Sequence, residues 1–259
     1  AAATIAVVYP HMNSIGGDSF WVIHSPGKAM GGIDACGAAA GLATKSWYAE
    51  RGITKAIPFR GAVAANTVAG TISGWGAAHK LSKQGLGGKL PLSRLLADAI
   101  YYAQAGVPVT HSQSSLTAKK REELKDIPGF AQTFLVDGQA PQTGSIFKQE
   151  RLAKTLRQIA RKGTEDYYRG ELAGLLAEEL AELGSPLRLS DLQRHQVKLI
   201  DPLELKHSMG SVYNMTPPTQ GVVSLMILGI LDQLNLKRFK VDSAEYVHHC
   251  VEATKQAFK

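Results

Sequence analysis

The spacing of hydrophobic residues predicts several helices in the middle of the chain. From Leu92 onward, apolar residues return every three or four positions, which is the spacing of one face of an α-helix. The same spacing predicts helices over 146–162 and 171–183, and Gly163 and Gly184 follow where glycine commonly ends a helix. The side chains expected to face inward are Leu95, Leu96, Ala99, Ile100, Ala103, Leu152, Leu156, Ile159, Leu172, Leu175, Leu176 and Leu180.

Shorter apolar runs predict β-strands on both sides of these helices. The runs Ser19–His24 and Lys28–Ala35 are separated by Ser25-Pro-Gly27, so they predict a β-hairpin. Two later segments, 197–205 and 211–215, also have the composition of strands.

Both ends of the sequence have apolar segments that we assign to helices. Residues 1–8 lack a basic leader, so we expect a buried helix end or strand there rather than a signal peptide. We expect a short turn of helix at Ser190–Gln193 and two longer helices over 219–234 and 243–258. The inward stripe of the last helix is expected to consist of Tyr246, Val247, Cys250, Val251 and Thr254.

Length and composition fit one globular domain. The chain has 259 residues, of which 44% are hydrophobic, and this can supply a substantial core. We therefore expect a single domain over residues 1–259, of mixed α/β class with more helix than strand. The longest nearly apolar run, Gly221–Leu231, has about half of the roughly 20 residues that span a bilayer, so no transmembrane segment is expected.

Charge and cysteine content narrow the class of protein. The net charge is +7, but the basic residues are spread through predicted helices without interleaved aromatic residues, which argues against nucleic-acid binding. The solvated basic face could instead be balanced by an acidic partner chain. Cys36 and Cys250 are too few for a disulfide framework and are compatible with a reducing compartment. We expect a cytoplasmic protein, or a periplasmic one if a signal segment precedes this sequence.

Common catalytic and cofactor motifs do not occur in their required context. There is no phosphate-binding loop, no dinucleotide fingerprint, no zinc-protease helix and no nucleophile elbow, so neither a cofactor nor a serine nucleophile is expected. His248, His249 and Cys250 are adjacent, and adjacent helical positions point about 100° apart, so we favour a structural role over metal binding. The turn Gly16-Gly17-Asp18 could hold an anion through its backbone amides, or could simply be a turn.

Four segments resemble, in the same order, the large subunit of γ-glutamyltransferase-type enzymes. They are Tyr9-Pro-His-Met-Asn-Ser-Ile-Gly-Gly-Asp-Ser-Phe-Trp21, Gly32-Ile-Asp-Ala-Cys-Gly-Ala-Ala-Ala40, Val68-Ala-Gly-Thr-Ile-Ser-Gly-Trp-Gly-Ala-Ala-His79 and Met215–Leu231. The resemblance implies an N-terminal nucleophile hydrolase, in which a precursor cuts itself and a threonine at the start of the small subunit becomes the nucleophile. The implied fold is an αββα sandwich shared between the two subunits, with this chain as the helix-rich large subunit. No catalytic residue is therefore expected in this chain.

One position departs from the γ-glutamyl-specific members of the family. In those members an arginine after the hairpin's second strand grips the α-carboxylate of the substrate, and Cys36 stands at the matched position. A neutral thiol cannot replace the bidentate, permanently charged guanidinium. The resemblance therefore implies an amidase or acylase rather than a γ-glutamyl enzyme, unless a relocated arginine such as Arg60 holds the carboxylate.

His11 and Asn13 are two further candidates for substrate binding. They belong to the segment that is more glycine-rich in typical members of the family, and Asn13 could donate to a substrate oxygen. The alternative is that Asn13 supports a turn and His11 makes a local hydrogen bond.

The resemblance implies a hydrolase of linear amide bonds that works as a heterodimer with the small subunit of its own precursor, and dimers of such heterodimers are conceivable. We expect a small acidic amide as substrate, with the hydrolysis of oxamate to oxalate and ammonia in purine catabolism favoured. A γ-glutamyl hydrolase or transferase acting on glutathione-like compounds and a glutaryl-cephalosporin acylase are the nearer alternatives. A non-catalytic relative used as a binding module is the alternative from another class.

Overall fold

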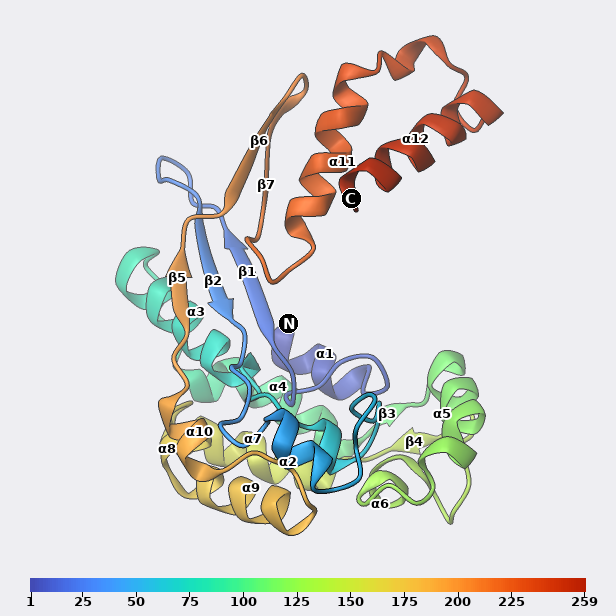
Figure 1. The fold of residues 1–259 in the computed structure, drawn as a ribbon. Coiled ribbons are helices and arrows are strands. Elements are labelled where there is room, and N and C mark those ends of the chain that lie inside the picture. Colours follow the sequence, from blue (N-terminus) through green and yellow to red (C-terminus); the bar gives the residue numbers. More distant parts are fainter. The chain divides into compact units, whose positions relative to one another are not determined.

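The computed structural model describes residues 1–259 and divides them into two compact units (Figure 1). The first unit consists of residues 1–19 and 35–197, and the second of residues 20–34 and 198–259. The expectation of one domain over residues 1–259 stays a prediction. No helix has the length and apolar character needed to cross a membrane.

The first unit is mainly helical. Its α-helices are α1 (Ala2–Val8), α2 (Lys45–Ala49), α3 (Thr71–Gly85), α4 (Leu92–Ala105), α5 (His111–Leu124), α6 (Phe130–Phe134), α7 (Glu150–Lys162), α8 (Asp166–Arg169), α9 (Glu171–Glu182) and α10 (Leu189–Arg194). It also holds the 3-10 helix η1 (Ala62–Ala64) and the short antiparallel strands β3 (Val107–Pro108) and β4 (Ile146–Phe147).

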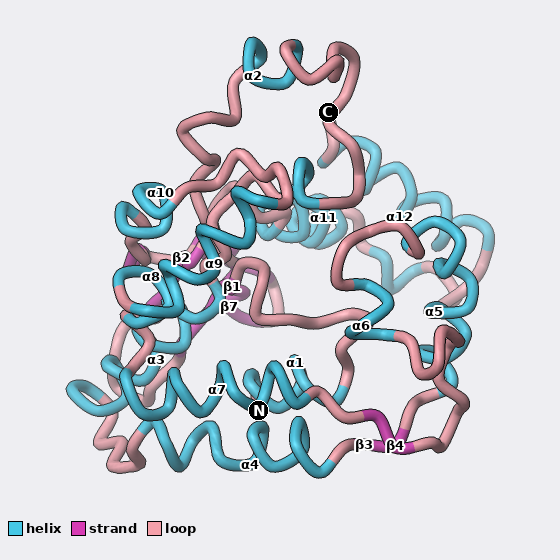
Figure 2. The backbone as a smooth tube through the Cα atoms, turned by 90° about the horizontal axis from the view of Figure 1, so that it is seen from below, coloured by secondary structure: helices cyan, strands magenta, loops and turns pink.

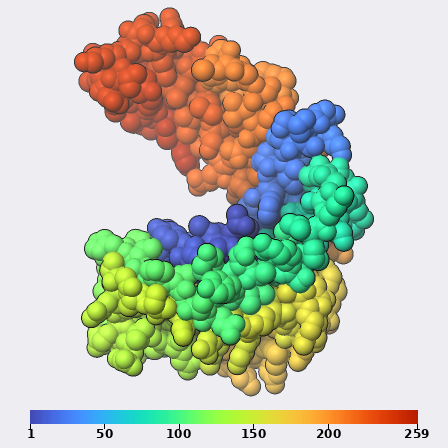
Figure 3. Space-filling view, turned by 180° about the vertical axis from the view of Figure 1, so that it is seen from behind, coloured from blue at the N-terminus to red at the C-terminus, as the bar shows by residue number.

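Three helices of this unit, α1, α4 and α7, run side by side (Figure 2). The space-filling view shows the dark blue N-terminal residues lying against the green part of the chain (Figure 3). The apolar spacing correctly predicted α4, which buries Leu96, Ala99 and Ala103, but Leu95, which was expected to face inward, is 43% exposed. The N-terminal segment is a helix that buries Ala3, Ala6 and Val7.

The predicted start of α7 was wrong. The segment from Ile146 was expected to be helical, but Ile146 and Phe147 form β4 and pair with Pro108 and Val107. The helix begins only at Glu150, after a strand too short to show a period of two. Its buried residues are Ala153, Leu156 and Ile159, while Leu152 is partly exposed.

The orientation of α9 also differs from the prediction. Leu175 was expected to face inward, yet it is 56% exposed. The residues of α9 that are buried are Ala173 and Ala177, and the helix packs on α8 and α10. Small residues let helices approach closely, so a row of alanines can form the buried face of a helix. The spacing of the leucines alone does not reveal such a face. Gly163 and Gly184 follow the ends of α7 and α9 with φ of 90° and 86°, as expected.

Helix α3 was not predicted, because glycine is unfavourable inside a helix. Its tertiary contacts compensate for this. Ile72 and Trp75 are buried, and a Cβ added at Gly76 would lie 2.4 Å from Oγ1 of Thr164. The glycine therefore allows α3 to approach its neighbour.

The second unit contains the larger sheets. Apart from the end residues Ser19 and Ala35, which belong to the first unit, its elements are β1 (Ser19–Ile23), β2 (Gly31–Ala35), β5 (Lys198–Ile200), β6 (Leu203–His207), β7 (Gly210–Asn214), α11 (Gly221–Gln233), the 3-10 helix η2 (Leu236–Arg238) and α12 (Ala244–Ala257). The predicted hairpin is confirmed, since β1 pairs with β2 and the N–H of Lys28 donates to the carbonyl of Ser25 over 3.0 Å. Strand β5 completes this sheet antiparallel to β2, with Gly32 opposite Ile200.

The predicted strand over 197–205 is two strands, because Asp201 and Pro202 lie between β5 and β6. Proline has no N–H for a sheet ladder, so pairing stops there. Strand β6 then pairs with β7, with Leu203 opposite Asn214.

The two predicted C-terminal helices are present as α11 and α12, which pack on each other. The side chain of Thr219 supports the start of α11, since its Oγ1 accepts a hydrogen bond from the N–H of Gly221 over 3.1 Å. The expected inward stripe of α12 was only partly right. Val247 and Val251 are each 49% exposed, whereas Ala253 and Ala257 are buried.

Candidate functional site

All three predicted substrate-binding residues lie in the first unit. His11 and Asn13 follow α1, in a turn closed by the N–H of Asn13, which donates to the carbonyl of Tyr9 over 3.0 Å. Cys36 directly follows β2. The side chain of Asn13 is exposed and forms no hydrogen bond within the chain.

The side chain of His11 is fixed by two neighbours. Its Nε2 lies 3.0 Å from Oγ of Ser112, and its ring centroid lies 4.2 Å from that of Tyr9. Burial lowers the pKa of His11, which favours the neutral imidazole. Its Nδ1 is buried without a partner, and an unpaired lone pair is less unfavourable there than an unpaired N–H. We therefore assign the proton to Nε2, which donates to Ser112.

Cys36 lies beside the carboxylate of Asp18. The thiol is 3.5 Å from Oδ2 of Asp18, while Oδ1 of the same carboxylate accepts a hydrogen bond from the N–H of Gly37 over 2.9 Å. Asp18 comes from the turn before β1, so its contact with Cys36 spans the whole hairpin. The sequence did not reveal this pairing, because only the hairpin brings residues 18 and 36 together.

The segment after β2 is held by a close approach of two backbones. A Cβ added at Gly37 would lie 1.5 Å from the carbonyl oxygen of Val68, and one added at Gly70 would lie 1.9 Å from that of Ala35. The N–H of Val68 donates to the carbonyl of Ala38 over 3.0 Å. Only glycine fits at these two positions, so Cys36 and Gly37 are held against residues 68–70.

The turn that contains Gly16 and Gly17 is connected to the start of α3. The carbonyl of Gly17 accepts hydrogen bonds from the N–H and from Oγ1 of Thr71, over 2.9 and 2.8 Å. The N–H of Gly16 donates to Oγ of Ser14 over 3.2 Å. The first amide of the suggested anion-binding turn is thus already paired within the chain.

A buried polar network that sequence reasoning missed lies behind this segment. Oγ of Ser73 is 2.8 Å from Nε2 of His195 and donates to the carbonyl of Gly70 over 2.7 Å. The ring of His195 stacks on that of Tyr168, with centroids 4.8 Å apart. Ser73 and His195 are separated by 122 positions, so no local spacing could signal their pairing.

The serine–histidine pair does not have the geometry of an activated nucleophile. Because the Ser73 hydroxyl already gives its proton to Gly70, the natural assignment has Nε2 of His195 donating to Oγ rather than accepting from it. A histidine that donates cannot act as the base for that hydroxyl. We interpret the pair as a structural link between α3 and the end of α10.

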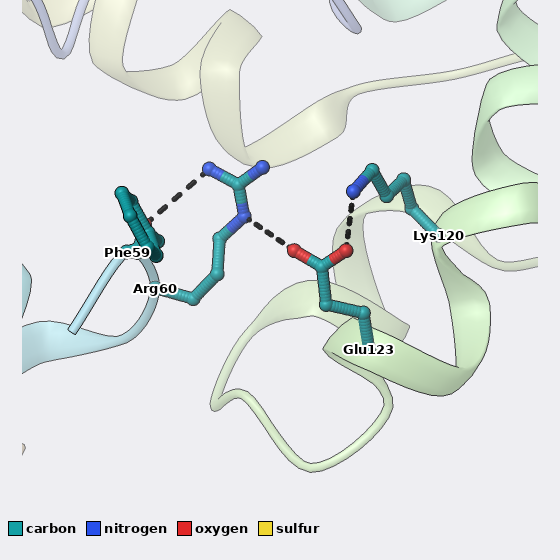
Figure 4. A network of polar contacts seen from close by, with 4 residues as sticks. All are labelled: Phe59, Arg60, Lys120 and Glu123. Carbon is teal, nitrogen blue, oxygen red and sulfur yellow. Dashed lines mark hydrogen bonds and ion pairs between the residues drawn. The ribbon is translucent and has the colours of Figure 1, made fainter.

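Arg60, the relocated arginine considered above, has a partner on α5. Its Nε lies 3.0 Å from Oε1 of Glu123, and Lys120 binds the other oxygen of the same carboxylate (Figure 4). Its Nη1 also donates to the carbonyl of Phe59 over 3.3 Å. The guanidinium is therefore already engaged with a carboxylate of its own chain.

The structure contains no group of three or more His, Cys, Asp or Glu side chains placed to hold a metal ion. The adjacent His248 and His249 rings are 5.7 Å apart and nearly perpendicular, and Nδ1 of His249 lies 2.7 Å from the carbonyl of Glu245. These side chains do not converge on a common point.

Comparison with known proteins identifies the class to which the chain belongs. The gamma-glutamyltranspeptidase family model matches residues 1–259, so the chain belongs to this family. It is 54% identical over 258 residues to the oxamate amidohydrolase proenzyme of Klebsiella pneumoniae, covering 100% of this chain and 48% of that protein.

Two solved structures have the same mixed helix-and-sheet fold. Helicobacter pylori gamma-glutamyltranspeptidase superposes with a TM-score of 0.89 at 27% identity, over 99% of this chain and 73% of that one. The cephalosporin acylase of Bacillus halodurans superposes with a TM-score of 0.86 at 31% identity, over 99% of this chain and 47% of that one. The expected family and fold class are therefore confirmed, and the chain spans about half the length of the curated relative reported above.

Proposed function

We propose that this chain is the large subunit of a self-processing amidohydrolase that hydrolyses a small acidic amide, with oxamate as the favoured substrate. The single observation that carries the proposal is the 54% identity to an oxamate amidohydrolase proenzyme along the full chain. The chemistry beside Cys36 supports it. A thiol stands where γ-glutamyl-specific relatives have an arginine, and the Asp18 carboxylate lies 3.5 Å from it, so the residue at this position offers an α-carboxylate no cation to bind.

In this proposal the remainder of the precursor forms a small subunit that begins with threonine. The threonine hydroxyl attacks the amide carbonyl, its own α-amine takes the proton, and ammonia leaves to give an acyl ester that water hydrolyses. Backbone and side-chain donors of the small subunit stabilise the oxyanion. The two subunits together complete the αββα sandwich, and heterodimers can pair further. We place the enzyme in the cytoplasm and in purine catabolism.

This chain contributes one wall of the substrate site. His11, Asn13 and Cys36 are the proposed substrate-binding residues. Asn13 is the most suitable donor to a substrate oxygen, since its side chain is exposed and makes no hydrogen bond within the chain. His11 is positioned by Ser112 and Tyr9, and burial lowers its pKa, so it shapes the wall without adding charge.

Hydrolysis or transfer of γ-glutamyl groups is a second candidate, favoured by the 0.89 TM-score with a gamma-glutamyltranspeptidase. Removal of glutaryl groups from cephalosporins is a third, favoured by the 0.86 TM-score with a cephalosporin acylase. A non-catalytic binding module would retain the fold but lack the N-terminal threonine.

The first test is the intact mass and N-terminal sequence of the protein purified from its complete gene. We expect two chains, the second starting with threonine. The processed protein is then assayed with oxamate, glutaryl and γ-glutamyl amides, and we expect the highest kcat/KM with oxamate. A single unprocessed chain without amidase activity would contradict the proposal, and a preference for γ-glutamyl amides would select the second candidate.

A further inference from the structure

The carboxylate of Asp18 binds two donors that belong to the segment after β2. Oδ1 accepts from the N–H of Gly37 over 2.9 Å, and Oδ2 lies 3.5 Å from the thiol of Cys36. Asp18 is nevertheless an exposed residue. The carboxylate thus contacts a backbone amide with one oxygen and a thiol with the other. An anion bound at this position would use the same two donors.

Both sides of this contact are fixed by further bonds. On the Asp18 side, Oγ1 of Thr71 donates to the carbonyl of Gly17 over 2.8 Å and reaches the carbonyl of Asp18 over 3.1 Å. On the other side, Gly37 lies so close to Val68 that not even a Cβ would fit between them. The backbone on each side of the contact between the carboxylate and the Gly37 N–H is therefore held in place.

The donors that Asp18 occupies are the groups that would otherwise face an incoming anion. A backbone N–H next to a thiol is a weak anion site. With Asp18 in place, this position carries a negative charge. A substrate that brought its own carboxylate there would meet a like charge and find the amide already taken.

We propose that Asp18 is a specificity-determining residue whose resident carboxylate excludes acyl groups that carry a carboxylate at the far end of a carbon chain. An amide whose carboxylate is attached directly to the scissile carbonyl does not reach this position and is admitted. The inference rests on the proposed function, because it assumes that Cys36 lines the substrate site.

Because Cys36 lies beside Asp18, an arginine introduced at position 36 would meet a carboxylate of its own chain. The new guanidinium would lie beside the Asp18 carboxylate and pair with it, since an arginine fork matches a carboxylate closely. The single substitution therefore leaves no cation free for a substrate. The double variant Asp18→Asn with Cys36→Arg removes the competing charge and frees the guanidinium.

The test compares four variants of the complete, processed enzyme. They are Asp18→Asn, Cys36→Arg, the double variant, and the control Asp98→Asn, which removes the same charge on α4 from a side chain that is 65% exposed. Asparagine retains an oxygen for the N–H of Gly37, so Asp18→Asn removes the charge while preserving the local shape. The assay measures kcat and KM for oxamate and for glutaryl and γ-glutamyl amides.

We expect Asp18→Asn to raise kcat/KM for the glutaryl amide relative to oxamate by about tenfold, mainly through KM, which corresponds to about 1.4 kcal/mol. Cys36→Arg alone is expected to change γ-glutamyl hydrolysis little, and the double variant to raise it by more than the product of the single effects. Asp98→Asn should leave every ratio unchanged.

Isothermal titration calorimetry with glutarate compares the affinity of the unaltered enzyme and of Asp18→Asn for a carboxylate ligand without turnover. We expect about tenfold tighter binding to Asp18→Asn than to the unaltered enzyme. Unchanged glutarate affinity, or a gain in γ-glutamyl hydrolysis from Cys36→Arg alone, overturns the inference while leaving oxamate hydrolysis as a separate result. Failure of the unaltered enzyme to hydrolyse oxamate overturns the proposed function, whatever glutarate binding shows.

Discussion

The hydroxyl of Tyr168 accepts a hydrogen bond from the N–H of Ser73 over 2.9 Å and donates one to the carbonyl of Ala69 over 2.8 Å. Tyr168 is almost completely buried. One phenol thus satisfies two backbone groups at the start of α3, next to the segment that holds Cys36 and Gly37. A side chain from α8 therefore supports the wall of the proposed substrate site.

We expect Tyr168→Phe to lower the free energy of unfolding by about 1 to 3 kcal/mol. The substitution retains the ring that stacks on His195 but leaves the Ala69 carbonyl and the Ser73 N–H without their partner. Urea unfolding followed by circular dichroism measures the change. Unaltered stability would mean that water replaces the hydroxyl without loss.

Tyr168 also makes the free energy of unfolding depend on pH in the alkaline range. Burial raises the pKa of Tyr168 to about 12 from 10.0. The native state therefore keeps a proton that the unfolded chain loses above pH 10, so this contribution is complete below pH 10 and disappears as the pH rises to about 12. Its size is on the order of 2 to 3 kcal/mol.

The difference in unfolding free energy between the unaltered protein and Tyr168→Phe should accordingly shrink between pH 10 and pH 12. Tyr167, whose pKa is raised by burial and by the neighbouring Tyr168, is present in both proteins, so the part of its contribution that comes from burial cancels. A difference that stays constant across this range would show that the phenol titrates equally in both states.

Substitution of Ser73 tests whether the Ser73–His195 pair has a structural or a catalytic role. We expect Ser73→Ala to lower stability by about 1 to 2 kcal/mol, because the buried Nε2 of His195 loses its partner. The kcat of the processed enzyme on oxamate should fall by less than about tenfold. A loss of several orders of magnitude with unchanged stability would instead identify Ser73 as a nucleophile.

The close approach at Gly37 predicts strong intolerance to any side chain. We expect Gly37→Ala to prevent folding or to lower stability by more than about 3 kcal/mol, because its Cβ would lie 1.5 Å from the carbonyl oxygen of Val68. Gly174→Ala in α9 is the matched control. Nothing lies within 4 Å of its added Cβ, so it should stabilise the protein by about 0.5 to 1 kcal/mol. Thermal unfolding of both variants tests the pair.

The ion pair of Arg60 predicts a small effect on substrate binding. Because its guanidinium is engaged by Glu123, we expect Arg60→Ala to change the KM for oxamate by less than about twofold. Steady-state kinetics at two salt concentrations provide the measurement. An increase in KM of tenfold or more, with kcat retained, would show that Arg60 binds the substrate carboxylate.

Much of the chain could be assigned from local sequence. The apolar spacing of α4 and the Ser25-Pro-Gly27 turn between β1 and β2 predicted those elements, because these patterns act over a few residues. Helix α3 could not be found in this way, since its glycines oppose helix formation and only contacts such as that of Gly76 with Thr164 explain it. The prediction that Leu175 faces inward was wrong for a related reason. Periodicity shows where the apolar residues of a helix lie, but not which of them a neighbouring element covers.

The sequence by itself determined the family, the β1–β2 hairpin, helices such as α4, α11 and α12, and the absence of an arginine at position 36. Only the tertiary structure decided that the carboxylate of Asp18 lies at Cys36 and Gly37, that Arg60 is engaged by Glu123, and that Ser73 meets His195. These pairs join residues far apart along the chain, and no local period encodes such contacts. Their positions follow instead from how strands and helices pack, which depends on the whole chain at once.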